Sequence, residues 1–156
     1  MIVEALSRSC LSNRYVLKLD TRPWGEYRGR WFSEYTDIHL TGRRQLQLKK
    51  EGWLRSRFAL TDAPGGRLLA EAERGGLFTS AWDIRLSIGQ ARLVSVGWFN
   101  SAFRVILGGQ ERAAINRVGA CGFGWAIRDD GSLQDTDLLF IGLIYHTILK
   151  RATSAE

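Results

Sequence analysis

A short sequence pattern recurs five times along this chain of 156 residues. Each copy starts with glycine and two mostly apolar residues, usually has serine at the fourth position after the glycine, and then has an aromatic residue at the sixth and an aliphatic residue at the eighth. The copies begin at Gly29, Gly52, Gly76, Gly97 and Gly119, with spacings of 21 to 24 residues, and the first copy is the loosest. A repeat of this length predicts one supersecondary unit copied along the chain.

Within each copy, apolar or small residues alternate with residues that are mostly polar. Alternation with a period of two predicts a strand that buries one face and exposes the other. The aromatic residue at the sixth position belongs to the inward column, so we expect Trp82 and Trp125 in the core. Trp53 and Trp98 stand next to the repeat glycine, and we expect them at the rim of the sheet.

Glycine-rich turn sequences follow these strands at 62–66, 88–90, 108–109 and 129–131. Gly-Gly and Asp-Gly supply the positive φ that tight hairpin turns require. Each repeat therefore predicts a hairpin of about 22 residues. Further strands, either return strands or strands upstream of the repeats, are expected at 15–19, 27–32, 35–40, 45–50, 67–73, 90–96 and 111–118. Together these elements predict an antiparallel meander of eleven or twelve strands.

The C-terminal segment has a different character. Asp135-Thr136-Asp137 suits a helix N-terminus and Lys150-Arg151 suits a helix C-terminus. The residues 138–149 between them are almost entirely apolar, and a helix that is apolar all round is buried. Because this run is shorter than the ~20 residues that span a bilayer, we expect a core helix at about 136–151 and no transmembrane segment.

These elements predict one domain, residues 1–156, of the mainly β class. A closed barrel of about 12 strands is too wide for its own side chains to fill. The apolar helix would supply the missing core. We therefore expect a closed antiparallel β-barrel around a central hydrophobic C-terminal helix.

The sequence 46–62, the segment Leu69–Ala72 and the apolar C-terminal helix resemble the Tubby C-terminal-like superfamily. The similarity is greatest to its small prokaryotic members, related to the LURP-one-related and phospholipid scramblase-like proteins, and it covers the chain from about Tyr15 onward. The resemblance implies a barrel of twelve strands around a central helix. It also implies a function in binding phosphoinositides or membranes, in tethering transcription regulators or in moving lipids.

The chain has 22 basic and 16 acidic residues, a formal net charge of +6, and most of its basic residues are arginine. Arginine binds phosphate and carboxylate groups in a planar fork. Lys49, Lys50, Arg55 and Arg57 flank the turn at Gly52, so we expect them on adjacent strands, within about a Debye length of ~8–10 Å. These four residues are the candidate site for an anionic lipid or another anionic partner. The alternative is a solvated charged face with no partner.

Residues suited to catalysis are few. His39 alternates with apolar neighbours on a strand and should face outward, whereas His146 should be a buried neutral residue of the helix. The carboxylates of Asp129 and Asp130 lie in a tight turn and should be exposed. No nucleophile elbow or phosphate-cradling loop occurs in the sequence. We therefore expect no enzymatic activity, no cofactor and no metal.

The expected function is a non-enzymatic module that binds an anionic phospholipid or membrane surface, or a protein partner. The alternative is a small hydrophobic-ligand carrier of the lipocalin type, which requires an empty lumen. Nucleic acid is not favoured, because most aromatic residues are assigned to the interior. We expect Cys10 and Cys121 to be free thiols, and the protein to lie in the cytoplasm or at the periphery of a membrane.

Overall fold

The computed structural model describes residues 1–10, 12–29, 35–51, 57–63, 66–75, 81–97, 102–119 and 124–154. Within these residues the chain forms twelve strands, one short 3-10 helix and one long α-helix. The elements are β1 (Ile2–Ser7), β2 (Arg14–Leu19), β3 (Arg22–Arg28), β4 (Tyr35–Leu40), η1 (Thr41–Arg43), β5 (Arg44–Glu51), β6 (Arg57–Ala63), β7 (Arg67–Arg74), β8 (Trp82–Leu86), β9 (Gly89–Val96), β10 (Ala102–Leu107), β11 (Gln110–Arg117), β12 (Trp125–Asp129) and α1 (Asp135–Ser154).

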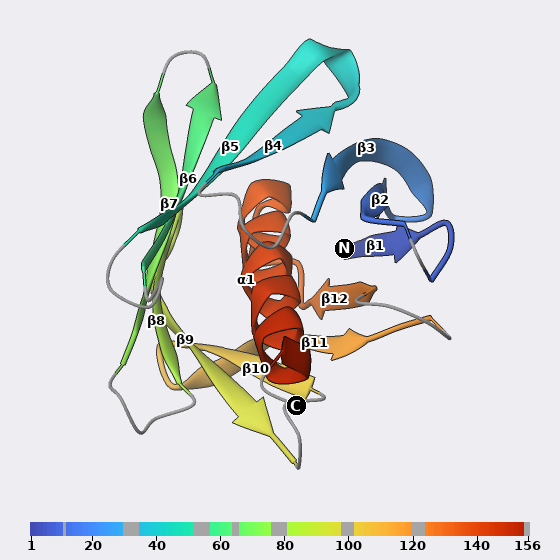
Figure 1. Ribbon diagram of the computed structural model, residues 1–156. Helices are drawn as coiled ribbons and strands as arrows, with labels where there is room; N and C mark the ends of the chain where they lie inside the picture. Colours follow the sequence, from blue (N-terminus) through green and yellow to red (C-terminus); the bar gives the residue numbers. More distant parts are fainter. Residues whose placement is uncertain are drawn as a thin grey trace.

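The twelve strands form a closed antiparallel barrel (Figure 1). Each strand pairs with its neighbours in sequence, and β1 closes the barrel by pairing with β12, with Ala5 opposite Trp125. The meander and the closure expected from the alternation are both confirmed. The expected strands do not include β1, although Val3 and Ala5 of β1 follow the same inward alternation and have no exposed surface.

The repeat glycines mark the ends of strands rather than their interiors. Gly29 directly follows β3, Gly97 directly follows β9, and Gly119 comes two residues after β11. Gly97 and Gly119 have φ of 80° and 91°, in the left-handed region where a side chain would be strained. Gly52 and Gly76 lie outside the described residues.

The aromatic residues of the repeat form the wall of the core, as expected. Phe58, Trp82, Phe103 and Trp125 point inward and are at most 4% exposed. The first and loosest copy differs, because Tyr35 begins β4 on the outward face and is 43% exposed. Trp53, Trp98 and the repeat serines lie outside the described residues.

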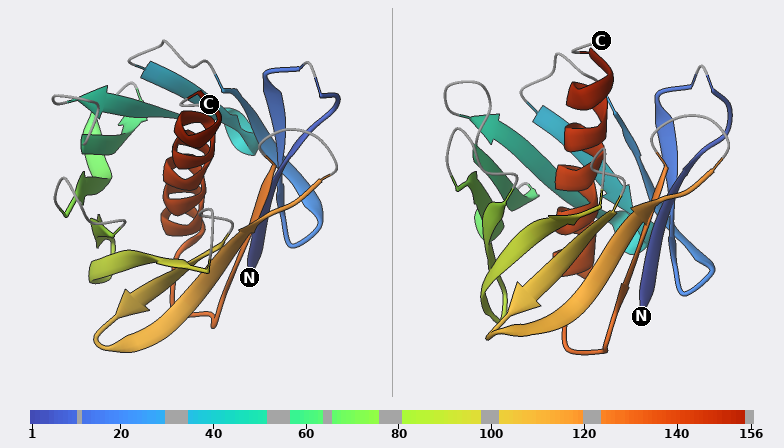
Figure 2. Two further views of the ribbon diagram at one scale, coloured as in Figure 1. Left: turned by 60° about the horizontal axis from the view of Figure 1, so that its bottom comes forward. Right: turned by 90° about the horizontal axis from the view of Figure 1, so that it is seen from below.

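Helix α1 runs through the interior of the barrel (Figure 2), and its apolar side chains belong to one buried core with the inward side chains of the strands. Leu139, Phe140 and Ile144 have no exposed surface, and the inward side chains of the strands pack around them. The expected core helix at about 136–151 is therefore confirmed, with α1 a few residues longer. Among the described residues, no helix combines the length and the apolar character needed to cross a membrane.

A line of polar groups crosses this otherwise apolar core. The indole Nε1 of Trp125 donates a hydrogen bond to the hydroxyl oxygen of Tyr27 at 3.0 Å, and that hydroxyl lies 3.0 Å from Nδ1 of His146. Because the hydroxyl oxygen already accepts from the indole, its own proton is available to Nδ1, which is then the acceptor of a neutral imidazole. His146 is buried, as expected for a core histidine, and burial raises the pKa of Tyr27.

The cysteine expectation needs a correction. Cys10 is disulfide-bonded, so the prediction of a free thiol at this position is wrong. Cys10 follows β1 and the other cysteine of the chain, Cys121, precedes β12, outside the described residues. Cys10 comes three residues after the end of β1, and β1 pairs with β12.

Candidate functional site

The barrel has two rims, which differ in the end of α1 that they surround. At the N-terminal rim, the Asp137 carboxylate accepts hydrogen bonds from the backbone N–H and hydroxyl of Ser87, at 3.0 and 2.6 Å. At the C-terminal rim, the guanidinium of Arg151 lies 5.7 Å from the ring centre of Phe58, and Lys150 Nζ donates to the carbonyl of Gly29. The right-hand view of Figure 2 shows the two ends of the helix at opposite ends of the barrel. We define each rim by the two outermost residues of every strand there, the described connecting residues and the adjacent end of α1.

The predicted site residues lie near the C-terminal rim, but they do not share one face. Lys50 pairs with Phe58 across β5 and β6, and Glu51 pairs with Arg57. Lys49 faces outward, 3.8 Å from Glu51. Lys50 belongs to the inward column of β5, on the lumen side, because neighbouring residues of a strand face opposite sides of the sheet. Arg55 lies outside the described residues.

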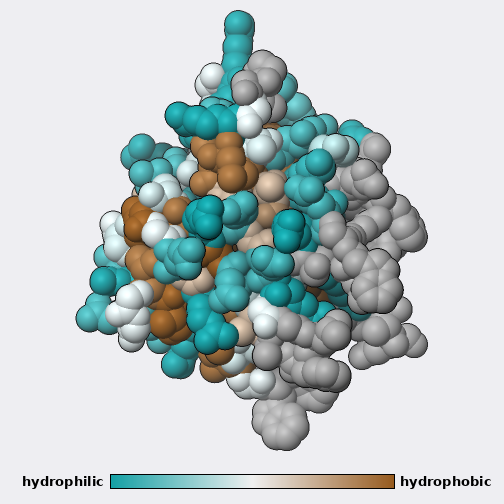
Figure 3. Space-filling model, turned by 90° about the vertical axis from the view of Figure 1, so that its left-hand side faces the viewer, coloured by the Kyte–Doolittle hydropathy of each residue, from teal (hydrophilic) through white to brown (hydrophobic). Residues whose placement is uncertain are grey.

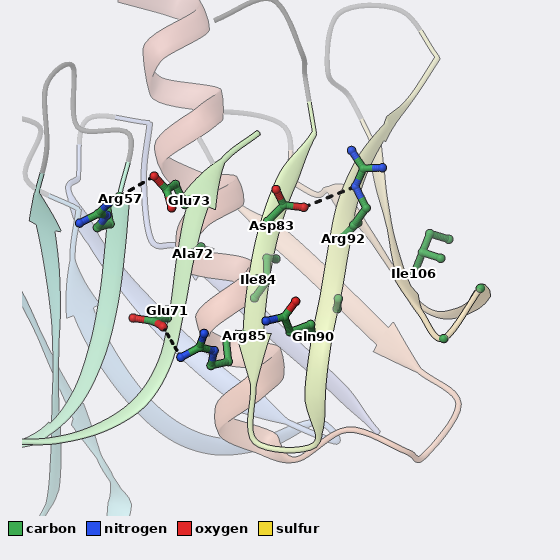
Figure 4. A pocket seen from close by; sticks show the side chains of 13 residues that line it. Arg57, Glu71, Ala72, Glu73, Asp83, Ile84, Arg85, Gln90, Arg92 and Ile106 are labelled. Atoms are coloured by element: carbon green, nitrogen blue, oxygen red, sulfur yellow. Dashed lines mark hydrogen bonds and ion pairs between the residues drawn. The ribbon is translucent and has the colours of Figure 1, made fainter. Parts of the chain in front are cut away.

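Arg57 lines a groove on the outer surface of β6 to β9 (Figure 4). The groove has a volume of about 730 Å³ and extends to Ile106 and the turn at Gly108 and Gly109. The outward alternation of the strands places a row of charged side chains along it. Cross-strand ion pairs line the groove: Arg57–Glu73 at 3.3 Å, Arg85–Glu71 at 2.9 Å and Arg92–Asp83 at 3.5 Å.

These pairs decide what the groove can do. Each arginine has a carboxylate within 3.5 Å, so the groove has little free positive charge for an anion. The side chains are between 38% and 64% exposed, and exposed ion pairs of this kind contribute only ~0–1 kcal/mol each. The carboxylates lack the buried setting that adapts a group to acid–base catalysis. Figure 3 shows this side of the molecule, on which hydrophilic side chains are interspersed with hydrophobic ones.

A second groove, of about 480 Å³, lies where β3 and β4 diverge. The described ladder between these strands has three rungs, from Gly25 opposite Leu40 to Tyr27 opposite Ile38. His39 lies on the outer face beside this groove, as its alternation predicted. The groove mixes charges of both signs and shows no preference for one kind of ligand. Its charged and polar lining residues include Arg14, Glu26, Arg28, Asp37 and His39.

Asp129 and Asp130, at the end of β12, were both expected to be exposed, but the side chain of Asp129 is buried. The side chain of Asp129 has no exposed surface and lies 3.2 Å from the amino group of Met1, because β1 pairs with β12. Asp130 is exposed, and hydrogen bonds from Ser132 and Arg112 lower its pKa to about 2. Among the residues that the structure describes, no group of three His, Cys, Asp or Glu side chains could hold a metal ion.

Charge is distributed unequally between the two rims, and this asymmetry becomes visible only when the barrel brings distant residues together. The described C-terminal rim has nine basic and three acidic residues: Arg8, Arg14, Arg28, Lys50, Arg57, Arg74, Arg117, Lys150 and Arg151, against Glu51, Glu73 and Asp83. The N-terminal rim has seven of each: Lys18, Arg22, Arg43, Arg44, Arg67, Arg85 and Arg128, against Asp20, Asp62, Glu111, Asp129, Asp130, Asp135 and Asp137. Among the side chains of the described residues, the C-terminal rim therefore has six more basic than acidic groups, and the N-terminal rim has no such excess.

No protein-family model matches the chain, and no curated protein sequence matches it. A solved structure does: the X-ray structure of a protein from Arabidopsis thaliana has a TM-score of 0.62 to this chain. The match covers 97% of this chain and 91% of the plant protein, at 12% sequence identity. At this identity the likeness concerns the fold alone.

Proposed function

We propose that this chain is a non-enzymatic β-barrel module, of the Tubby C-terminal-like kind that its sequence resembles, which binds an anionic lipid or protein surface through its basic residues. The observation that carries the proposal is the excess of basic over acidic residues at the C-terminal rim. Lys50 and Arg57, two of the predicted site residues, belong to this rim, and Lys49 lies next to it.

The electrostatics support this proposal. A basic residue near an anionic membrane surface contributes ~1 kcal/mol to binding, and this contribution falls off within a Debye length. Charges on one rim of a barrel can all approach the same surface, whereas charges spread over the whole barrel cannot. Arginine adds bidentate hydrogen bonds to phosphate or carboxylate groups.

The lipocalin-type alternative has lost its main requirement, which was an empty lumen. α1 occupies the lumen, and its apolar side chains pack against the inward columns of the strands. A hydrophobic ligand in the lumen would have to share this space with the helix. The surface-binding function needs no such rearrangement, and we therefore prefer it.

The test is co-sedimentation with vesicles of phosphatidylcholine, with and without phosphatidylserine, across a salt series. We expect binding that requires phosphatidylserine and weakens as salt rises. Charge reversal at two predicted residues, Lys49→Glu with Arg57→Glu, should weaken the binding to phosphatidylserine vesicles relative to the parent protein at the same salt concentration. If the parent protein binds no anionic vesicle at low salt, the lipid version is excluded. The protein version then predicts a partner that cross-links to the parent and not to the charge-reversed variant.

A further inference from the structure

We propose that the barrel docks end-on on an anionic lipid bilayer, with the C-terminal rim toward the lipid and the axis of α1 roughly along the membrane normal. This inference rests on the proposed function, and it selects a lipid bilayer as the partner and assigns an orientation. Three features of the described residues lead to it: the arrangement of the basic residues, the nearly equal numbers of basic and acidic groups at the opposite rim and the ion pairs along the outer wall.

The basic residues of the C-terminal rim come from many separate elements. They belong to β2, β3, β5, β6, β7, β11, α1 and the connection after β1. In the barrel order β2 and β3 are neighbours, as are β5, β6 and β7, whereas β11 lies on another part of the wall, so the charges come from several arcs of the mouth rather than from one strand. A spread of this kind matches a flat charged surface better than a narrow groove or a single extended peptide.

Some of these charges are available to a partner. Arg8 and Arg28 are exposed, and neither forms an ion pair with any residue in the described part of the chain. Arg57, by contrast, shares its charge with Glu73. The free arginines can therefore approach phosphate groups without first giving up a carboxylate partner.

The described part of the opposite rim lacks this excess of basic residues, so charge is distributed asymmetrically along the barrel axis. The described N-terminal rim has equal numbers of basic and acidic residues, and two of the acids, Asp135 and Asp137, stand in the first turn of α1. An anionic plane therefore attracts one end of the barrel and not the other. The dipole of α1 places only about half a negative charge at the C-terminal end, which is small beside the excess of basic residues there.

The outer wall offers a weaker alternative. Along the groove of β6 to β9, each of the three arginines is paired with a carboxylate. Docking on this side would bring as many negative as positive side chains to the lipid. An end-on orientation brings the C-terminal rim, with its excess of basic residues, to the lipid and keeps Glu71, Arg85 and Arg92 of the wall in water.

Two matched variants test the orientation. Arg8→Glu with Arg28→Glu changes the C-terminal rim, and Arg43→Glu with Arg44→Glu changes the N-terminal rim by the same total charge. All four arginines are exposed and lack an ion pair among the described residues. Arg28 lies three residues beyond Gly25, whose partner Leu40 ends β4 close to Arg43 and Arg44. At ~3.3 Å per residue the two sites are therefore ~10 Å apart along the strand direction, about one Debye length at about 0.1 M salt.

Vesicles of phosphatidylcholine with phosphatidylserine serve as the probe, at about 0.1 M salt. We expect R8E/R28E to lose at least about tenfold in partition coefficient, and R43E/R44E to stay within about twofold of the parent. Circular dichroism and thermal unfolding check that both variants fold. If R8E/R28E does not fold, the neutral variant R8Q/R28Q replaces it. It should reduce the logarithm of the partition coefficient by about half as much as the charge reversal would.

The outcomes separate the two proposals. If both charge-reversed variants lose binding equally, the end-on orientation is wrong, although the proposed anionic binding stands. If R43E/R44E loses more than R8E/R28E, the orientation is also wrong. If the parent does not bind the anionic vesicles, the lipid version of the proposed function fails, and the orientation fails with it.

Discussion

The hydroxyl of Tyr27 lies 3.0 Å from Nδ1 of His146, so β3 and α1 are joined by a polar contact inside an apolar core. The apolar surface of α1 surrounds the helix almost completely, and hydrophobic packing alone distinguishes poorly between rotations of such a helix. A buried hydrogen bond does distinguish them, because a rotated helix would leave polar groups unsatisfied. We infer that this contact helps to fix the rotation and depth of α1 in the barrel.

Replacing Tyr27 with phenylalanine removes the hydroxyl and keeps the ring. The Nε1 of Trp125 then loses its acceptor and Nδ1 of His146 loses its donor, both in a buried setting. We expect the free energy of unfolding to fall by ~1–3 kcal/mol, as measured by urea denaturation. Tyr35→Phe, which changes an exposed ring, is the control. An unchanged unfolding midpoint for Y27F would show that the polar line is dispensable.

Alkaline pH should destabilise the protein through its buried tyrosines. Burial raises the pKa of Tyr145 to about 12 and also raises that of Tyr27, from an ordinary value of 10.0. Because the pKa is higher in the folded state, their stabilising contribution is complete below pH ~10 and is lost as the pH rises toward ~12. Urea unfolding across this range should show the decline, and Tyr145→Phe should reduce its slope. An identical slope in parent and variant would contradict this account.

The sequence predicted those parts of the fold that depend on local pattern. Alternation placed Phe58 and Trp82 inward, and the unbroken apolar run predicted a core helix. The same alternation places Lys49 and Lys50 on opposite faces, so the expected four-residue patch was inconsistent with the pattern that predicted the strands. Sequence spacing does not show the closure of β1 on β12, because it joins opposite ends of the chain. The contact of the buried Asp129 side chain with the amino group of Met1 depends on that closure.

Gly142 should not tolerate even a methyl group. Glycine in the middle of a helix usually costs ~0.5–1 kcal/mol relative to alanine, so an exposed site would gain stability from the change. Here an added Cβ would lie 2.0 to 2.4 Å from three ring atoms of Trp125, a residue with no exposed surface. We expect Gly142→Ala to lower the free energy of unfolding by at least ~1–3 kcal/mol, the usual cost of overpacking a core, as measured by thermal and urea unfolding.

A double variant tests the cause. Combining Gly142→Ala with Trp125→Leu should cost less than the sum of the two single changes, because the smaller side chain leaves room for the methyl group. Strict additivity would mean that the two residues do not interfere, and a stabilising G142A would mean that the helix has room to shift.

The disulfide of Cys10 should contribute measurably to stability. Native disulfides typically contribute ~2–4 kcal/mol, and Cys10 follows β1, one of the two strands that close the barrel. We expect Cys10→Ser to lower the free energy of unfolding by this amount, and reductant to lower that of the parent similarly. Reductant should not affect C10S further, which provides the internal control. A parent that unfolds identically with and without reductant would contradict the prediction.

Helix α1 should be indispensable for folding, since it is the core of the barrel rather than an appendage. Leu139, Phe140 and Ile144 have no exposed surface, and deletion of residues 138–156 removes all three at once. Truncating one such side chain costs ~2–5 kcal/mol, whereas a whole domain has only ~5–15 kcal/mol of stability. We therefore expect the deletion to give an insoluble or molten chain without near-ultraviolet circular dichroism. The milder Phe140→Ala should fold but lose ~3–5 kcal/mol. A truncated chain that stays soluble and unfolds cooperatively would mean that the twelve strands can close without the helix.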